Sequence, residues 1–95
     1  MAIHSPLGYQ QITSLSAAVA PTVPANTERC LLQAETQNVR FRDDGTDPTA
    51  TVGMILVAGA APFPYEGNVS ALKFIEATAS AKLNILYYPE RTYVR

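Results

Sequence analysis

The stretch Arg29–Thr51, RCLLQAETQNVRFRDDGTDPTAT, decides the fold class. It contains two alternating runs, and in the second, Val39–Arg42, apolar and cationic residues alternate strictly. Alternation of this kind places successive side chains on opposite faces of a sheet. Asp43-Asp44-Gly45 follows, and an Asp-Gly step is a strong turn signal because glycine adopts positive φ without a Cβ clash. The stretch therefore predicts a hairpin of two strands, joined at Thr36–Asn38 and followed by a polar loop.

Turn residues separate further short strands on either side. Tyr9–Leu15 predicts an edge strand, and the prolines of Pro21–Asn26 predict an extended connection ending in a turn. A one-turn helix at Ser14–Val19 is the alternative to an extended chain there. The continuous apolar run Met54–Ala58 predicts a strand buried on both faces. Later strands are expected in three segments: Phe63–Tyr65, Leu72–Ile75 and Ala81–Tyr88. Pro64 limits the first of these to a sheet edge or a bulge.

These strands recur at roughly the 8–12-residue spacing of small all-β domains, and no long segment has helical periodicity. The predicted fold is all-β: a compact antiparallel β-sandwich or small jelly-roll-like barrel. Its single domain is expected at residues 9–88, between an extended N-terminal arm (1–8) and a C-terminal tail (89–95). The alternation predicts a buried core of Leu32, Val39, Phe41, Ile55, Leu72, Phe74, Leu83 and Ile85.

The composition argues against several classes of protein. Seven basic and eight acidic residues give a net charge of −1, and no basic patch exists to bind nucleic acid. No stretch approaches the ~18 apolar residues of a membrane span, and the N-terminus lacks a signal-peptide pattern, so synthesis in the cytoplasm is expected. Charged residues make up only 16% of the chain, below the usual quarter, which points to a surface buried against a partner.

Few residues offer chemistry. His4 is the one histidine and lies in the arm, and Cys30 lies in an apolar run, as a buried cysteine does. Asp43, Asp44 and Asp47 either form a solvated turn, which we favour, or offer oxygens to calcium. No phosphate loop, nucleophile elbow or metal-ligand spacing occurs, so the sequence predicts no enzyme, no cofactor and no metal.

Two sets of side chains could instead form contacts with other proteins or ligands. Arg40 and Arg42 share one strand face, with Arg29 expected opposite them, and either bind a protein partner or form a solvated face paired with Glu28 or Glu35. An aromatic group is either a binding surface or, as we favour, the core and rim of the fold: Phe63, Tyr65, Tyr87, Tyr88 and Tyr93.

Two segments resemble small virion structural proteins of tailed bacteriophages: LLQAETQNVRFRDDGTDPTATVGMILVAG from Leu31, and LKFIEATASAKLNILYY from Leu72. The resemblance covers roughly Pro24–Tyr88 and is structural, so it brings no catalytic residues with it. It implies a β-rich fold and a place on the virion. Such groups include head decoration (cement) proteins, which sit between capsid subunits, often as trimers, and tail- or fibre-associated proteins.

The sequence therefore predicts a non-enzymatic capsid decoration protein that binds the major capsid protein or other virion proteins and forms a homo-oligomer, most simply a trimer. The alternatives are a tail or fibre adaptor and a small β-sandwich that binds carbohydrate or another host ligand. Apolar residues in the arms and the paired arginines are the expected interface: Ile3, Leu7, Arg40, Arg42, Tyr93 and Val94.

Overall fold

The computed structural model describes residues 6–89, which form two antiparallel sheets. Their strands are β1 (Gly8–Ile12), β2 (Arg29–Glu35), β3 (Val39–Arg42), β4 (Met54–Leu56), β5 (Phe63–Tyr65), β6 (Lys73–Glu76) and β7 (Lys82–Tyr88). A 3-10 turn at Val69–Ala71 is the only helical element in this part of the chain. The all-β, antiparallel class predicted from the sequence is confirmed.

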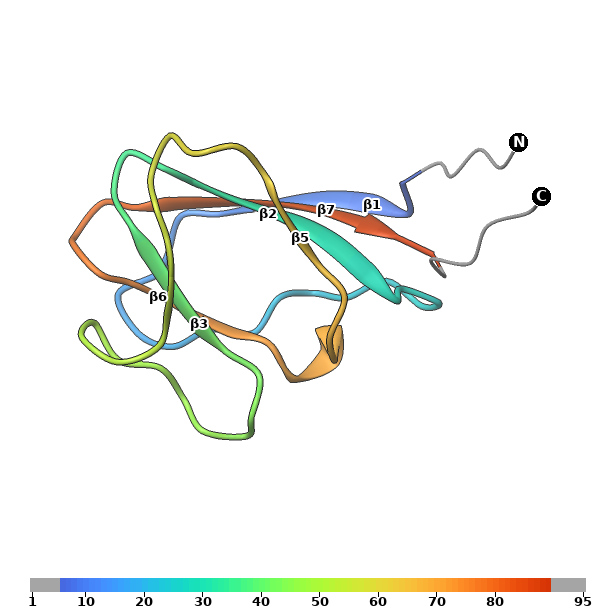
Figure 1. Ribbon diagram of the computed structural model, residues 1–95, viewed down its shortest axis with the longest axis horizontal. Helices are drawn as coiled ribbons and strands as arrows, with labels where there is room; N and C mark the ends of the chain where they lie inside the picture. The colour runs from blue at the N-terminus through green and yellow to red at the C-terminus, as the bar shows by residue number, and fades with distance from the viewer. Residues whose placement is uncertain (1–5, 90–95) are drawn as a thin grey trace.

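The first sheet has the strand order β1-β7-β2-β5, and the second has the order β4-β3-β6. Figure 1 shows β1, β7 and β2 side by side in one layer, with β3 and β6 in the other layer. The two central strands β2 and β7 pair along their full length, from Arg29 opposite Tyr88 to Glu35 opposite Lys82. The first sheet is therefore built around a pair of strands far apart in sequence.

Alternation along the strands sets the core. In β2 and β7 every second residue is buried, and in β3 the buried residues are Val39 and Phe41. Side chains of both sheets form one hydrophobic cluster, in which Leu32, Val39, Leu72, Phe74, Leu83 and Ile85 have no exposed surface. Seven of the eight predicted core residues are buried, with Phe41 at 7% exposure.

The exception is Ile55, which is 44% exposed, while its neighbour Leu56 is buried. The prediction that Met54–Ala58 forms a strand buried on both faces is wrong. β4 is an edge strand with only β3 beside it, so its apolar side chains lack a second layer of neighbours. Periodicity alone does not tell a central apolar strand from an edge one.

The predicted hairpin is also wrong in its pairing. β2 pairs with β5 and β7, whereas β3 pairs with β4 and β6, so the two strands lie in different sheets. The chain changes sheet at Thr36, whose φ of 66° is left-handed. Arg29 consequently does not lie opposite Arg40 and Arg42.

Other expectations are confirmed. β1 is an edge strand, and so is β5 with its proline. Residues 14–19 form no helix, and the connection through Pro21 ends in a turn at Ala25-Asn26, where Asn26 has a φ of 69°. Cys30 is buried, at 2% exposure.

Candidate functional site

Arg40 and Arg42, the described arginines expected at an interface, both make contacts within the chain. Arg40 donates from Nε to the carbonyl of Ala50 (3.1 Å) and from Nη1 to the carbonyl of Gly53 (2.8 Å). Its guanidinium therefore closes the long loop between β3 and β4. Gly53 has a φ of 142°, and a Cβ there would lie 3.2 Å from the Arg40 Cβ and the Phe41 carbonyl, so this close approach requires glycine.

Arg42 forms a two-pronged ion pair with Asp44. Nε donates to Oδ1 over 3.0 Å and Nη2 to Oδ2 over 2.6 Å. The hydrogen bonds from Arg42 lower the pKa of Asp44, and this carboxylate raises the pKa of Arg42 in turn. The pair is local, and it leaves 27% of the Arg42 side chain and 55% of the Asp44 side chain exposed.

The three loop carboxylates have separate partners. Asp44 binds Arg42, Asp47 accepts from Lys73 Nζ (3.3 Å), and Asp43 accepts from the phenolic hydroxyl of Tyr65. Between Pro6 and Pro89 the structure contains no cluster of three or more side chains suited to hold a metal ion. The loop has the arrangement of a turn whose carboxylates bind side chains of neighbouring segments.

The remaining expected interface residues divide in two. Leu7 is 40% exposed, and its backbone N–H donates to the Tyr87 carbonyl (2.6 Å), which fixes the entry into β1. Ile3, Tyr93 and Val94, like His4, lie outside the described residues.

The aromatic residues that the structure describes do not gather on one exposed surface. Tyr65 and Tyr87 are buried, and Tyr87 donates to Gln10 Oε1 (2.7 Å). Burial raises the pKa of Tyr87 to about 12, and burial with the Asp43 hydrogen bond raises the pKa of Tyr65 further. The Arg29 guanidinium lies over the Tyr88 ring, with its Cζ 4.7 Å from the ring centroid. The interpretation of these aromatic residues as core and rim is confirmed for Tyr65 and Tyr87, which are both buried.

Most of the exposed large apolar residues lie in a segment that the sequence analysis did not single out as an interface. Seven large apolar residues are exposed in the described chain, and five of them fall within one segment that carries β4 and enters β5: Val52, Met54, Ile55, Val57 and Phe63. We call these five residues the apolar edge. A groove runs between β2 and this segment, lined by Leu32, Ala34, Ile55, Leu56, Val57 and Phe63.

A sequence signal for this surface exists. The stretch Pro48–Tyr65 contains no charged residue, although it includes a long loop and two edge strands that face solvent. Solvent-facing segments of a soluble domain normally carry charges. The low overall charge pointed to a buried surface but did not locate it.

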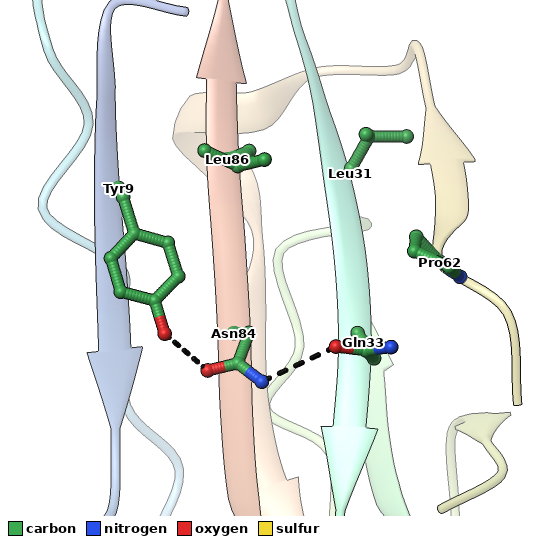
Figure 2. A pocket seen from close by; sticks show the side chains of 6 residues that line it. All are labelled: Tyr9, Leu31, Gln33, Pro62, Asn84 and Leu86. Carbon is green, nitrogen blue, oxygen red and sulfur yellow. Dashed lines mark hydrogen bonds between the residues drawn. The ribbon is translucent and has the colours of Figure 1, made fainter. Parts of the chain in front are cut away.

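A second surface is polar and uncharged. On the outer face of the first sheet, Tyr9 donates to Asn84 Oδ1 (2.5 Å), Gln11 Nε2 donates to the same oxygen (3.0 Å), and Asn84 Nδ2 donates to Gln33 Oε1 (3.4 Å). We call these four residues the amide face. Figure 2 shows Tyr9, Asn84 and Gln33 in a row across three strands, with Leu31, Leu86 and Pro62 beside them around a shallow pocket.

Residues 6–89 include no helix of the length and apolarity that crossing a membrane requires. Comparison with known proteins yields no matching family model, no matching curated protein and no matching solved structure.

Proposed function

We propose that this chain is a non-enzymatic structural protein of a tailed-phage virion, and that it decorates the capsid by binding between capsid subunits. The observation that carries the proposal is the apolar edge. Met54 is 65% exposed and Val57 55%, in a chain with few charges to keep such a surface in water. Large apolar side chains exposed together in one segment of a small domain favour burial against another protein subunit.

The architecture suits a role in binding rather than in chemistry. As part of the proposal, the two sheets pack face to face as a β-sandwich, or a jelly-roll-like variant of it, which gives a rigid body around one core. Such a body presents its edges and loops in fixed positions, so a partner binds without ordering them first. The resemblance of Leu31–Gly59 and Leu72–Tyr88 to virion proteins supports the same role.

Contacts with the capsid are assigned to residues outside the core. Leu7 and the solvent-facing Arg42 belong to this set, together with Ile3, Tyr93 and Val94. Arg40 belongs to it as well, although its guanidinium also holds the β3–β4 loop. An interface of standard size, about 800 Å² per partner, is about a seventh of the 5577 Å² surface of the chain.

The test is the location and copy number of the protein in purified virions. Quantitative mass spectrometry should find it in numbers comparable to the major capsid protein, and an electron-microscopy map should place it on the head. A few copies at the tail would instead support the adaptor alternative. Absence from the particle would overturn the virion role altogether.

The amide face favours a second candidate function, binding of a neutral glycan. Amide groups and an exposed tyrosine ring, here 59% exposed in Tyr9, are groups that hydrogen-bond and stack on sugar rings. A glycan array with the purified protein tests it. Binding that is lost in Tyr9→Ala and kept in Thr13→Ala, a change of an exposed residue beyond β1, would support it; no binding by the parent protein would exclude it.

A further inference from the structure

Four strands lie at sheet edges in the described chain, and two of them, β5 and β6, are protected against pairing with another chain. β6 is covered by Val19, which exchanges two 2.8 Å backbone hydrogen bonds with Phe74, and by Leu15, whose carbonyl accepts from Glu76. β5 contains Pro64, which has no N–H to donate. β1 differs from β4 in that its exposed side chains are Tyr9 and Gln11, which hydrogen-bond to Asn84 within their own sheet.

β4 has none of these protections. It contains no proline and no charged residue, and in the described chain no strand lies on its outer side. Natural sheets normally block such edges with lysine, proline or a covering segment, because an open edge is a template for another strand. The unprotected edge of β4 is therefore suited to pair with a strand from another chain.

The register shows which backbone groups of β4 face outward. Phe74 directs its backbone N–H and C=O to Val19, away from β3. Phe74 and Phe41 therefore form a non-hydrogen-bonded pair. The backbone N–H and C=O of Phe41 consequently point to β4, where Met54 lies opposite. Backbone groups alternate sides along a strand, so the N–H and C=O of Ile55, which lies opposite Arg40, point away from β3. The N–H of Ala58 donates to Asn38 Oδ1 (2.8 Å), on the inner side, as the same alternation requires.

We propose that β4 pairs with β4 of a second copy of this chain, antiparallel and about a two-fold axis that places Ile55 opposite Ile55. Both outward groups of Ile55 are then used, since each copy donates its N–H to the other's carbonyl. The second sheets of the two copies become one continuous sheet, and the apolar edges of both copies lie against each other.

Two observations favour a second copy over another occupant. A strand whose central residue offers one donor and one acceptor is complementary to itself in antiparallel pairing. Pro48–Tyr65 is also uncharged, so the same segment brought against itself meets no like charge and leaves no ion unpaired. The pair is a dimer, unlike the trimer expected from the resemblance, and it does not depend on the virion role. It occupies the apolar edge with a second copy, so in a virion the contacts with the capsid fall to the other residues assigned to them, such as Leu7 and Arg42.

The test uses a pair of complementary substitutions. Ile55→Lys and Ile55→Glu each place two like charges directly opposite each other across the proposed axis. In sedimentation velocity the parent protein should have the mass of a dimer, and each variant should raise the dissociation constant at least about tenfold, which corresponds to 1.4 kcal/mol. Mixing the two variants should restore a dimer, because lysine then faces glutamate.

Thr13→Lys is the matched control, since it places the same charge on an exposed residue next to another edge strand. It should leave the mass unchanged, and circular dichroism should show all three variants folded. A parent protein that is a monomer or a trimer, an Ile55→Lys variant that remains a dimer, or equal dissociation by Thr13→Lys would overturn the proposal. These results are obtained without virions, so they are independent of the test of the virion role.

Discussion

The Tyr65 hydroxyl donates a hydrogen bond to the Asp43 carboxylate and so joins β5, at the edge of one sheet, to the end of β3 in the other. Tyr65 is 7% exposed, whereas Asp43 is exposed, so a buried donor meets a carboxylate that also faces water. Gly67 lies against this contact: a Cβ at this position would be 2.7 Å from Tyr65 Cζ and 3.0 Å from Asp43 Oδ2.

Asp43→Ala should lower the free energy of unfolding by about 1–3 kcal/mol, because the buried Tyr65 hydroxyl then has no acceptor. Tyr65→Phe should cost less, since the exposed carboxylate left behind is hydrated. Urea unfolding of both single variants and the double variant measures the coupling. If the effects of the two single changes simply add, the contact does not stabilise the fold.

Phe74→Ala should lower the free energy of unfolding by about 3–5 kcal/mol. The Phe74 side chain has no exposed surface, and its ring lies 6.2 Å from that of Phe41. Phe63→Ala is the matched control, because Phe63 lies at the same 6.2 Å from Phe41 but is 45% exposed. Thermal melts should show a large loss for the first and a small one for the second; equal losses would contradict the assigned core.

Arg40→Ala should open the loop between β3 and β4 and cost about 1.5 kcal/mol, the low end for charged donors, because one of its two hydrogen bonds is exposed. Arg42→Ala should leave stability close to that of the parent, since its ion pair with Asp44 is solvent-facing. Urea unfolding separates the two. Hydrogen exchange should additionally show faster exchange at Val52 and its neighbours in Arg40→Ala alone.

In a virion-binding assay, Arg42→Ala should weaken attachment if Arg42 contacts the capsid as proposed. Full-strength binding by this variant would remove Arg42 from the interface while leaving the fold unaffected.

The free energy of unfolding should fall as the pH rises above about 9. Burial raises the pKa of Cys30 from 9.0 to about 12, so between these values the unfolded chain loses the thiol proton while the folded chain keeps it. Deprotonation then favours the unfolded state, by about 1.4 kcal/mol per pH unit for one such group. Burial of Tyr87, with its pKa at about 12, acts in the same direction above its ordinary value of 10.0.

Urea titrations at several alkaline pH values measure this slope. Cys30→Ala should be less stable overall but should show a shallower fall with pH than the parent. An unchanged slope would mean that the Cys30 thiol does not titrate differently in the two states.

The sequence predicted which side chain of each strand faces the core far better than it predicted which strands pair. Alternation in Val39–Arg42 and Lys82–Tyr88 is a local property, and both strands bury the expected residues. Pairing depends on where the chain turns, and the left-handed Thr36 sends β3 into the other sheet rather than back along β2. No local pattern distinguishes these two courses.

The dependence of strand order on the whole fold also explains why the sequence did not locate the candidate site. Ile55 belongs to an apolar run that resembles a central strand, and only the sheet order shows it at an edge. The amide face was equally hidden, because Tyr9, Gln33 and Asn84 come from three strands whose neighbourhood is set by the fold.

The position of β7 between β1 and β2 determines when this protein can fold during synthesis. β1 pairs only with β7, from Gly8 opposite Tyr87 to Ile12 opposite Leu83, so the first strand made waits for the last described one. Pairings over such sequence distances slow folding, because the intervening chain must be ordered before the contacts form. Until β7 has been synthesised, the β2 backbone lacks the strand with which it pairs from Arg29 to Glu35, so an incomplete chain exposes an unpaired strand to chaperones.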